Sequence, residues 1–377
     1  MKNFDFTTVI DRTDTSSWQY EAFDVDVLPA WLADMNFRAP PCVLEALHKS
    51  VDHGIFGYST PSHALRELIL ERLSARHNWQ TAAESLVFLP GLVTALNVAA
   101  RLLNNEAEVL VPIPAYGPFL SCAPNQGKKT VTVPMAIIDG IWRFDLAALQ
   151  AAVTPQTTML ILCNPHNPTG RSLQYRELAE IADFVQRNNL LLLCDEIHCD
   201  LILDPAAKHL SIAAEFPEIA EQTITLLSPS KTFNLAGIGC AFAVIANKDL
   251  RERFQRGSEG LVPHISQPGL VAMEAAYRDG EEWRRALIEQ LRSNLTQVVT
   301  TIENMPALSM IAPQATYLAW IDCQRLRQDD PSRLFLRQKL ALGAGRFFGA
   351  DQFVRFNFAL PPSTLSEALQ RLRADSH

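Results

Sequence analysis

The chain has 377 residues, which is long enough for two domains, because single hydrophobic cores stop growing at about 250–300 residues. Hydrophobic residues make up 48% of the chain and charged residues 20%, which is typical of a globular protein and argues against a disordered or fibrous one. The formal net charge is −8, and no block of Lys or Arg occurs along the chain. A nucleic-acid partner is therefore not expected.

The N-terminal stretch places charges among isolated apolar residues, so it lacks the apolar core of a secretory signal. No apolar run approaches the roughly 18 residues that a membrane helix needs, and we expect a cytoplasmic protein with no membrane partner. The seven cysteines form no CxxC pair, and Cys163 and Cys194 lie in apolar runs. We expect reduced thiols that pack as small hydrophobic residues, and no motif indicates a metal site.

Short apolar runs alternate with longer helical patterns between about residues 60 and 245. The runs are continuous rather than alternating, which is typical of strands buried on both faces of a sheet. The segments between them show apolar spacing near 3.6 residues, as in 92–103 and 173–189. This order predicts an α/β fold with a mostly parallel sheet. The expected strands are LVFLP (86–90), EVLVPIP (108–114), TMLILC (158–163), NLLLLC (189–194) and TITLLS (223–228).

The two ends of the chain differ from this middle part. Proline and turn-forming residues are frequent at the N-terminus, while the C-terminal part combines a long amphipathic helix over 283–305 with short strands over 315–322 and 353–360. We expect a large α/β domain over residues 46–275 and a smaller α+β domain built from residues 1–45 and 276–377.

In open α/β sheets, ligands bind at the carboxyl ends of the strands, so residues that directly follow the apolar runs are informative. Asp195 and Glu196 follow NLLLLC. A carboxylate at the end of a buried strand loses hydration and persists only where a cation or several donors compensate. The protonated ring nitrogen of pyridoxal 5′-phosphate (PLP) is one such cation. A helix N-cap or an internal salt bridge is the alternative.

Lys231 lies behind the strand TITLLS, in a turn with Ser228 and Ser230. A lysine in such a place can lose its proton and attack an aldehyde, and the flanking hydroxyls can bind phosphate oxygens. A solvated surface lysine is the alternative, but it leaves the Ser-Pro-Ser frame unexplained. Gly91 and Leu92 lie between another strand and a helix, where backbone N–H groups favour an anion.

The strand TMLILC runs into NPHNPTG (164–170), a rigid turn that projects Asn164 and Asn167. A side-chain amide held there can donate a hydrogen bond to a phenolate oxygen, although a well-made loop is the alternative. Tyr116 follows EVLVPIP and could stack on a flat heterocycle, or be a core or rim residue. Arg355 lies in the apolar strand FVRFNFAL and needs an anionic partner, either a substrate carboxylate or an internal Asp or Glu.

Three motifs in this order, NPHNPTG, DEIHCDL (195–201) and SPSKTFNLAG (228–237), resemble fold-type I PLP enzymes of the aminotransferase class I/II superfamily. The match runs from about Leu28 to Leu360. LPAWLADMNF (28–37) and FGYS (56–59) are similar to the branch of cystathionine β-lyase and cysteine-S-conjugate β-lyase enzymes. The resemblance implies a PLP-dependent transferase-like fold with a mostly parallel seven-stranded sheet.

The resemblance also implies a role for each candidate residue. Lys231 would bind the cofactor covalently, and Arg355 would bind the substrate carboxylate. Tyr58 would reach the phosphate of the neighbouring subunit, so that a homodimer is the functional unit. The remaining cofactor contacts would be Asp195 at the pyridine nitrogen, Asn167 at O3′, Tyr116 on the ring, and Gly91, Leu92, Ser228 and Ser230 at the phosphate.

Two departures from the aminotransferase pattern resemble the lyase branch. The stretch AGIGCAF (236–242) lacks the phosphate-binding arginine of many transaminases, and His198 stands where they often have tyrosine, so we count His198 among the cofactor-binding residues. Asn36 departs from the lyases, whose motif usually has a second aspartate there. This difference leaves the detailed substrate preference open.

The resulting hypothesis is an α,β-elimination from cystathionine or a related cysteine thioether, which yields pyruvate, ammonia and a thiol. Lys231 would act as the general base that removes the Cα proton. An aminotransferase is the nearest alternative, because it shares the chemistry up to that step. A second alternative is a regulator that keeps the PLP scaffold and sequesters a transcription factor.

Overall fold

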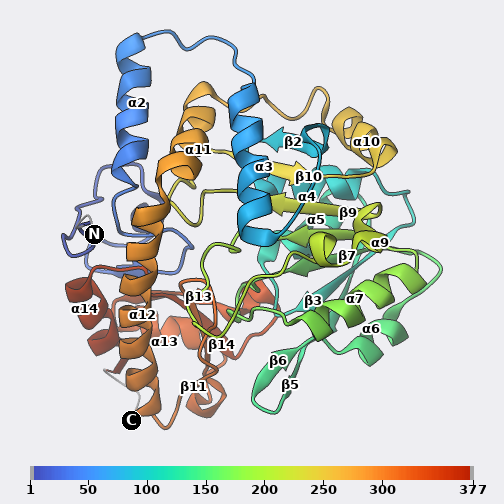
Figure 1. Cartoon of the computed structure of the whole chain (residues 1–377). Coiled ribbons are helices and arrows are strands. Elements are labelled where there is room, and N and C mark those ends of the chain that lie inside the picture. The colour runs from blue at the N-terminus through green and yellow to red at the C-terminus, as the bar shows by residue number, and fades with distance from the viewer. Residues whose placement is uncertain (1–3, 374–377) are drawn as a thin grey trace.

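The computed structural model describes residues 4–373 and contains a seven-stranded sheet in the order β2-β10-β9-β8-β7-β3-β4 (Figure 1). Neighbouring strands are parallel, except that β10 runs antiparallel to β2 and β9. The predicted mostly parallel sheet is therefore confirmed. Its strands are β2 (Leu86–Leu89), β3 (Glu108–Ile113), β4 (Lys129–Pro134), β7 (Thr157–Cys163), β8 (Leu191–Asp195), β9 (Thr223–Leu227) and β10 (Ala241–Val244).

All five apolar runs that we expected to be strands are strands of this sheet. In β8, for example, Leu192, Leu193 and Cys194 are fully buried, because helices cover both faces. The sequence analysis did not identify β4 and β10. β4 is a partly exposed edge strand without a continuous apolar run.

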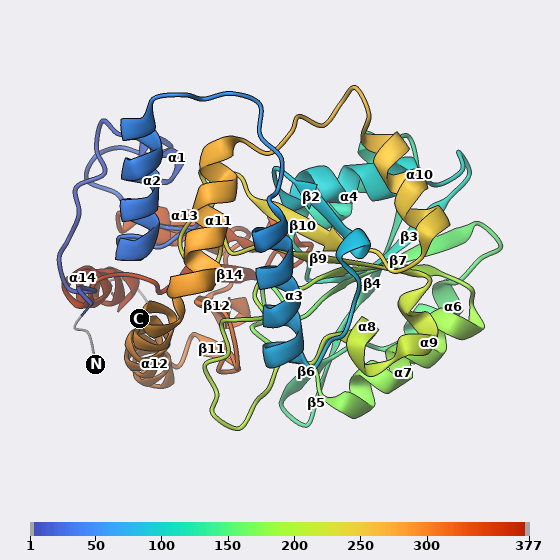
Figure 2. The same ribbon diagram turned by 45° about the horizontal axis from the view of Figure 1, so that its top comes forward.

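Helices cover the two faces of the large sheet and make three layers (Figure 2). Apolar residues of α4, α5 and α10 pack on one face, and those of α6, α7, α8 and α9 pack on the other. The predicted helix over 92–103 is α4, and that over 173–189 is α7. The bounds are α4 (Leu92–Arg101), α5 (Gly117–Asn125), α6 (Leu146–Ala152), α7 (Tyr175–Arg187), α8 (Ile212–Glu215), α9 (Pro217–Ala220) and α10 (Lys248–Ser258).

A second sheet, in the order β1-β13-β14-β12-β11, combines a strand near the N-terminus with four strands near the C-terminus. α12 and α14 lie beside it in Figure 1. The exact domain boundaries stay a prediction. The elements are β1 (Leu28–Ala30), β11 (Ser309–Met310), β12 (Leu318–Asp322), β13 (Leu340–Ala344), β14 (Phe353–Asn357), α12 (Glu281–Glu303), α13 (Pro331–Arg337) and α14 (Pro362–Arg373).

The remaining elements connect the two sheets or extend from them. α2 and α3 pack against α11, and β5 and β6 form a separate hairpin. Three short 3₁₀ helices cover Ala83–Ser85, Gln324–Leu326 and Gly345–Phe348. The bounds are α1 (Trp18–Glu21), α2 (Pro41–His53), α3 (His63–His77), α11 (Gln267–Asp279), β5 (Ala136–Ile138) and β6 (Ile141–Arg143).

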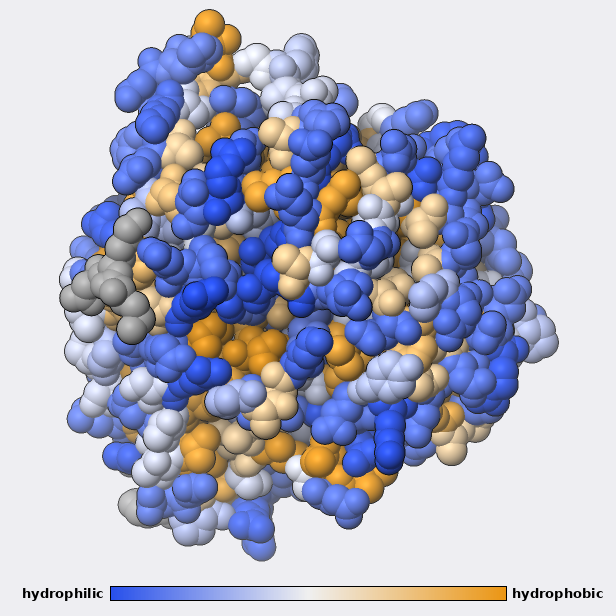
Figure 3. All heavy atoms as spheres, in the orientation of Figure 1, coloured by the Kyte–Doolittle hydropathy of each residue, from blue (hydrophilic) through white to orange (hydrophobic). Residues whose placement is uncertain are grey.

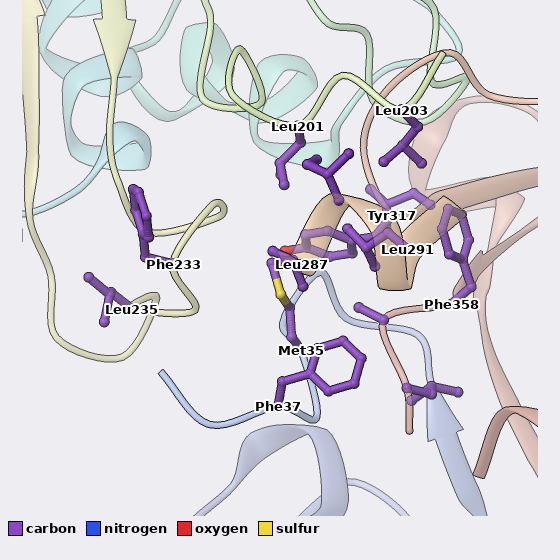
Figure 4. Close-up of a cluster of buried hydrophobic side chains, with 14 of the residues drawn as sticks. Met35, Phe37, Leu201, Leu203, Phe233, Leu235, Leu287, Leu291, Tyr317 and Phe358 are labelled. Carbon is purple, nitrogen blue, oxygen red and sulfur yellow. The ribbon is translucent and has the colours of Figure 1, made fainter. Parts of the chain in front are cut away.

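A cluster of buried side chains joins segments that are distant in sequence (Figure 4). It includes residues of the segment after β1, the loop after β9, α12 and the small sheet, among them Met35, Phe37, Phe233, Leu235, Leu287, Leu291, Tyr317 and Phe358. Asn234 adds hydrogen bonds, because its Nδ2 donates to the carbonyl oxygens of Met35 and Phe37 at 3.0 and 2.8 Å. The loop after β9 and the segment after β1 are thereby held together.

None of the helices within residues 4–373 has the length and apolar character required of a membrane span. The predicted cytoplasmic location stays a prediction. All seven cysteines are free thiols, and six of them are buried, Cys163 and Cys194 included. These two side chains pack in the cores of the large sheet as small hydrophobic residues, as predicted.

Candidate active site

A cavity of about 700 Å³ lies at the carboxyl ends of β7, β8 and β9, where parallel strands are expected to place a ligand site. Ten of the eleven predicted site residues line this cavity; the exception is Tyr58. They are Gly91, Leu92, Tyr116, Asn167, Asp195, His198, Ser228, Ser230, Lys231 and Arg355.

Asp195 is the last residue of β8 and is 4% exposed. Its Oδ1 accepts a hydrogen bond from the backbone N–H of Ile197 at 3.0 Å, and it has no salt bridge with a described Lys, Arg or His. Burial raises the pKa of Asp195 to about 7, against the opposing effects of this hydrogen bond and of the Lys231 charge. A buried carboxylate without a directly bound cation is suited to a cationic group of a ligand.

Glu196, the next residue, belongs to a different environment. Its carboxylate accepts a hydrogen bond from Ser211 Oγ at 2.9 Å and lies 2.9 Å from His209 Nε2. These buried partners satisfy its oxygens, and Glu196 does not line the cavity. The pair Asp195–Glu196 thus separates into one carboxylate that faces the cavity and one that stabilises the fold.

Lys231 lies in the turn after β9, and its Nζ donates a hydrogen bond to the carbonyl oxygen of Ala33 at 2.6 Å. Burial, helped by the positive charge of Arg355, lowers the pKa of Lys231 to about 8, whereas Asp34 and Asp195 oppose the shift. A larger fraction of this amine is therefore neutral near pH 7 than in an ordinary lysine, which makes Nζ a better nucleophile and base.

Ser230, beside Lys231, and the start of α4 offer hydrogen-bond donors to an anion. Ser228 Oγ donates to the carbonyl oxygen of Cys240 at 2.6 Å and lies 2.8 Å from Ser230 Oγ. Gly91 precedes α4, Leu92 is its first residue, and a Cβ atom added to Gly91 would meet nothing within 4 Å. The space before this helix N-terminus is open, and its free backbone N–H groups favour a phosphate.

Arg355 lies in β14 and is 5% exposed. Its Nη1 donates to Asn167 Oδ1 at 3.0 Å, its Nη2 donates to the Trp31 carbonyl oxygen at 2.8 Å, and its guanidinium carbon lies 4.7 Å from the centroid of the Phe348 ring. Within residues 4–373 it has no ion pair with Asp or Glu, and Nε has no hydrogen-bond partner. Burial lowers the pKa of Arg355 only to about 10, so it stays cationic at neutral pH. It can therefore bind a carboxylate that enters the cavity.

The two asparagines of the NPHNPTG turn differ in position. Asn167 uses Oδ1 to accept from Arg355, so that its Nδ2 can donate to a ligand. Asn164 is fully buried, accepts from the backbone N–H of Leu173 at 3.0 Å and donates to the carbonyl oxygen of Leu210 at 3.0 Å. Asn164 therefore stabilises the turn and does not project into the cavity.

Two ring side chains complete this part of the wall. Tyr116 precedes α5, and its ring packs edge to face on Phe119 at 5.6 Å between centroids. His198 packs edge to face on Tyr317 at 6.3 Å, and its Nδ1 has no hydrogen-bond partner among the described residues. Burial lowers the pKa of His198 to about 3, so the ring is neutral at physiological pH. A neutral ring does not compete with Arg355 for an anion.

Tyr58 is fully exposed in the connection between α2 and α3 and lies outside the cavity. Ile55 and Phe56 in the same connection are also exposed. Orange spheres stand at the tip of this connection in Figure 3, where apolar side chains face solvent in one chain. The expected role of Tyr58 in a neighbouring subunit stays a prediction.

The sequence analysis missed a set of residues that the N-terminal part of the chain brings to the cavity. They include Arg12, Trp18, Ala33 and Asp34, and the loop after β9 adds Asn234. A charged residue, Asp34, follows the short apolar run 28–33, which was a signal of the same kind as Asp195 after β8. The contacts of Arg12 and Trp18 had no such signal.

The cavity fits a flat cofactor that carries an aldehyde, a phosphate and a cationic ring nitrogen, together with an amino-acid substrate. The amine of Lys231 can bind the aldehyde, and the buried carboxylate of Asp195 gains a cation. The N-terminus of α4 can hold the phosphate, and the unpaired guanidinium of Arg355 gains a carboxylate. Each buried charge that lacks a partner in the protein is thereby matched by one ligand group.

The chain is similar to known proteins over nearly its full length. It is 33% identical over 387 residues to cystathionine beta-lyase PatB of Bacillus subtilis, and the match covers 99% of each chain. It is 40% identical to the solved structure of OvoB, with a TM-score of 0.96 and 98% of each chain covered. The structure of cystalysin from Treponema denticola, which contains a PLP cofactor, is 31% identical, with a TM-score of 0.93 and 98% of each chain covered.

The model of a family described as aminotransferase class I and II matches residues 32–372. This range contains the three motifs and all eleven predicted site residues, ten of which line the cavity. The resemblance inferred from these motifs is confirmed. The chain belongs to the aminotransferase class I and II family.

Proposed function

We propose that this chain is a PLP-dependent carbon–sulfur β-lyase that converts cystathionine or a related cysteine S-conjugate to pyruvate, ammonia and a thiol. The observation that carries the proposal is a buried, unpaired Arg355 in the same cavity as Lys231 and Asp195. The choice of reaction is supported by the similarity to the cystathionine beta-lyase PatB. The choice of cofactor is supported by the PLP in cystalysin and by the fit of the cavity.

Four side chains and a phosphate site in the cavity wall would hold the cofactor. Lys231 would bind its aldehyde carbon, and Asp195 would keep its ring nitrogen protonated. Asn167 would donate from Nδ2 to the ring oxygen, and Tyr116 would cover the ring. The phosphate would lie at the N-terminus of α4 and against the two serines. Bound in this way, PLP accepts electrons from the substrate and so stabilises the negative charge at Cα.

The residues of the chain would then bind the substrate and move its protons. Arg355 would bind the α-carboxylate and orient the substrate. Lys231, with a pKa lowered by burial, would act as the general base that removes the Cα proton. The Cβ–S bond breaks, the sulfur leaves with its bonding electrons and takes up a proton, and hydrolysis of the three-carbon remainder gives pyruvate and ammonia. One water is consumed for each substrate.

A product assay without any 2-oxo acid tests the proposal. We expect the purified holoenzyme to release pyruvate and thiol from L-cystathionine in equal amounts. A Lys231→Ala variant should release neither. A requirement for a 2-oxo acid acceptor, without thiol release, would instead identify an aminotransferase. If a Lys231→Ala variant kept the full effect of the wild type on gene expression in cells, this result would favour the regulatory alternative.

We also propose that the functional unit is a homodimer in which Tyr58 contacts the cofactor phosphate of the other subunit. Support comes from the exposed apolar connection with Ile55, Phe56 and Tyr58, which has no cover in one chain. Mixing Lys231→Ala and Tyr58→Phe subunits tests the arrangement. A hybrid dimer would contain one site with Lys231 and an intact Tyr58, so its activity should exceed that of either parent variant. A hybrid no more active than the parents would contradict the contact between subunits.

A further inference from the structure

Five charged side chains line the cavity, and the proposed function uses only three of them. They are Arg12, Asp34, Asp195, Lys231 and Arg355. Asp195 and Lys231 would bind the cofactor, and Arg355 would bind the α-carboxylate of the substrate. Arg12 and Asp34, two charges of opposite sign in the same wall, are left without a ligand group.

Asp34 lies close to the reacting groups. It directly follows Ala33, whose carbonyl oxygen accepts the 2.6 Å hydrogen bond from Lys231 Nζ. Its own carbonyl oxygen accepts a hydrogen bond from Asn357 Nδ2 at 2.5 Å, which holds the segment against β14. Its carboxylate also acts on the lysine, since it raises the pKa of Lys231 against the effect of burial. Asp34 therefore borders the space that a substrate bound at Lys231 would occupy.

Arg12 is paired with Asp34 and held in place by two neutral neighbours. Its Nη2 lies 3.0 Å from Asp34 Oδ2, and its Nη1 donates to Asn36 Oδ1 at 2.8 Å. Its guanidinium carbon lies 5.3 Å from the centroid of the Tyr20 ring, and the Tyr20 hydroxyl accepts from Asn36 Nδ2 at 2.9 Å. These contacts fix the direction of the guanidinium before a substrate binds.

The Arg12–Asp34 pair keeps the capacity to bind a ligand. Asp34 is the one carboxylate that pairs with Arg12 within residues 4–373, so the two charges cancel. The side chains are 22% and 24% exposed, and both line the cavity. Hydrogen bonds from Nη1 and Nη2 of Arg12 engage three of the five N–H groups of its guanidinium. The other two N–H groups have no partner among the described residues.

A neutral pair with free donors and acceptors matches a ligand that carries both charges itself. A carboxylate can bind to Arg12, and an ammonium group can donate to the oxygens of Asp34. An apolar tail would remove water from both groups without replacing its hydrogen bonds, and that loss disfavours binding. An α-amino acid end supplies both groups on one carbon.

We propose that Arg12 and Asp34 bind a zwitterionic α-amino acid end on the leaving thiol, which makes Arg12 a specificity-determining residue. The preferred substrate then carries an amino acid at each end of its thioether. The inference rests on the proposed function, because it assigns the leaving group of that elimination.

The test compares substrates that share the Cβ–S bond and differ in the tail. L-cystathionine carries the zwitterionic end, and S-butyl-L-cysteine carries a neutral tail. We expect Arg12→Met to lower kcat/KM for L-cystathionine about 10- to 100-fold more than for S-butyl-L-cysteine, the size of one lost charged hydrogen bond. Asp34→Asn should reduce the preference for L-cystathionine over S-(3-carboxypropyl)-L-cysteine, which lacks the ammonium group.

Arg176→Met is the matched control, because Arg176 is exposed on α7 and lies outside the cavity. It should leave the ratio of the two kcat/KM values as in the wild type. Equal losses on both substrates in Arg12→Met would mean that Arg12 only positions the N-terminal segment, and would overturn the inference. Wild-type kcat/KM values that are equal for both substrates would overturn it too, while the lyase assignment would stand. Pyruvate from neither substrate would instead refute the proposed function.

Discussion

Replacement of Asp195 by asparagine is expected to stabilise the PLP-free protein while it weakens the enzyme. The carboxylate is buried without a directly bound cation, and burial raises its pKa from 3.8 to about 7. Between these values the folded state holds a proton that the unfolded state has released, so the free energy of unfolding falls as pH rises. Above pH 7 the penalty is complete. Asparagine has the same shape, can still accept from Ile197 N–H and carries no charge.

The size of the effect follows from the two pKa values. One pKa unit corresponds to about 1.4 kcal/mol, so the raised pKa of Asp195 lowers the free energy of unfolding by about 4 kcal/mol at pH 8 and by about 2 kcal/mol at pH 5. The amide of the variant also needs partners, which costs about 1–2 kcal/mol at either pH. This cost cancels when the two pH values are compared. The stability advantage of Asp195→Asn should therefore be about 2–3 kcal/mol larger at pH 8 than at pH 5.

Urea unfolding of the PLP-free proteins at both pH values, at one protein concentration, measures this difference. Asp200→Asn is the matched control. Asp200 is as buried as Asp195, but Arg72 and Arg76 contact it at 2.7 and 2.8 Å. Although burial alone would raise it, these arginines hold the pKa of Asp200 well below its usual range. The stabilising charge of Asp200 is present above pH 4. Asp200→Asn should therefore lower the free energy of unfolding by about 3–5 kcal/mol at both pH values.

The outcome for Asp195 decides whether the electrostatic argument holds. If the difference between Asp195→Asn and the wild type is the same at pH 5 and pH 8, the carboxylate does not carry a raised pKa in the empty cavity. The reason for expecting a cationic ligand group at Asp195 would then be lost. Addition of PLP should make the wild type more stable than Asp195→Asn, since the wild type gains a charged contact that asparagine cannot form.

Three further results are expected. In the PLP-free protein, labelling of Lys231 Nζ by an amine reagent should rise with pH around a midpoint near 8, because burial lowers the pKa of Lys231. Mass spectrometry measures the labelling, and a midpoint near 10 would contradict the lowered pKa. Arg355→Gln should lower kcat/KM about 100-fold by removing the partner of the substrate carboxylate, while the visible absorbance of bound PLP is kept; loss of that absorbance would show a different role. Gly170→Ala should lower the free energy of unfolding by roughly 3 kcal/mol or more, because φ is +70° and the new Cβ would lie 2.2 Å from Pro313 Cβ. A decrease of less than about 1 kcal/mol in urea titrations would contradict this.

The sequence predicted those parts of the cavity that depend on local order along the chain. Lys231 and Asn167 follow buried strands and Asp195 ends one, and the carboxyl ends of neighbouring parallel strands meet at one edge of a sheet. Once the apolar runs are recognised as strands of one sheet, their trailing residues must lie close together. β4 was missed for a related reason, because a partly exposed edge strand lacks the continuous apolar run that identified the others.

The contacts of the N-terminal segment could not be predicted in this way. Ala33 and Lys231, whose hydrogen bond is among the shortest in the cavity, are 198 residues apart in the sequence. No periodicity in either segment encodes the pairing. It depends on the buried cluster in Figure 4, in which Met35 and Leu235 come from the same two segments. Contacts of this kind follow from tertiary packing and are visible only in the folded chain.

The charges of the cavity make binding and folding depend on each other. Asp195 and Arg355 lie in the protein interior without partners of opposite charge among the described residues, although the fold pairs Asp200 with two arginines. Pairing Asp195 or Arg355 internally would stabilise the empty chain, but it would also remove the reason for a ligand to bind there. The hydrogen bonds of Asn234 and the buried cluster hold the loops that surround these charges. A cofactor and a substrate that supply the missing charges would offset the cost of this burial, and the same geometry would place Lys231 for the proton transfer that we propose.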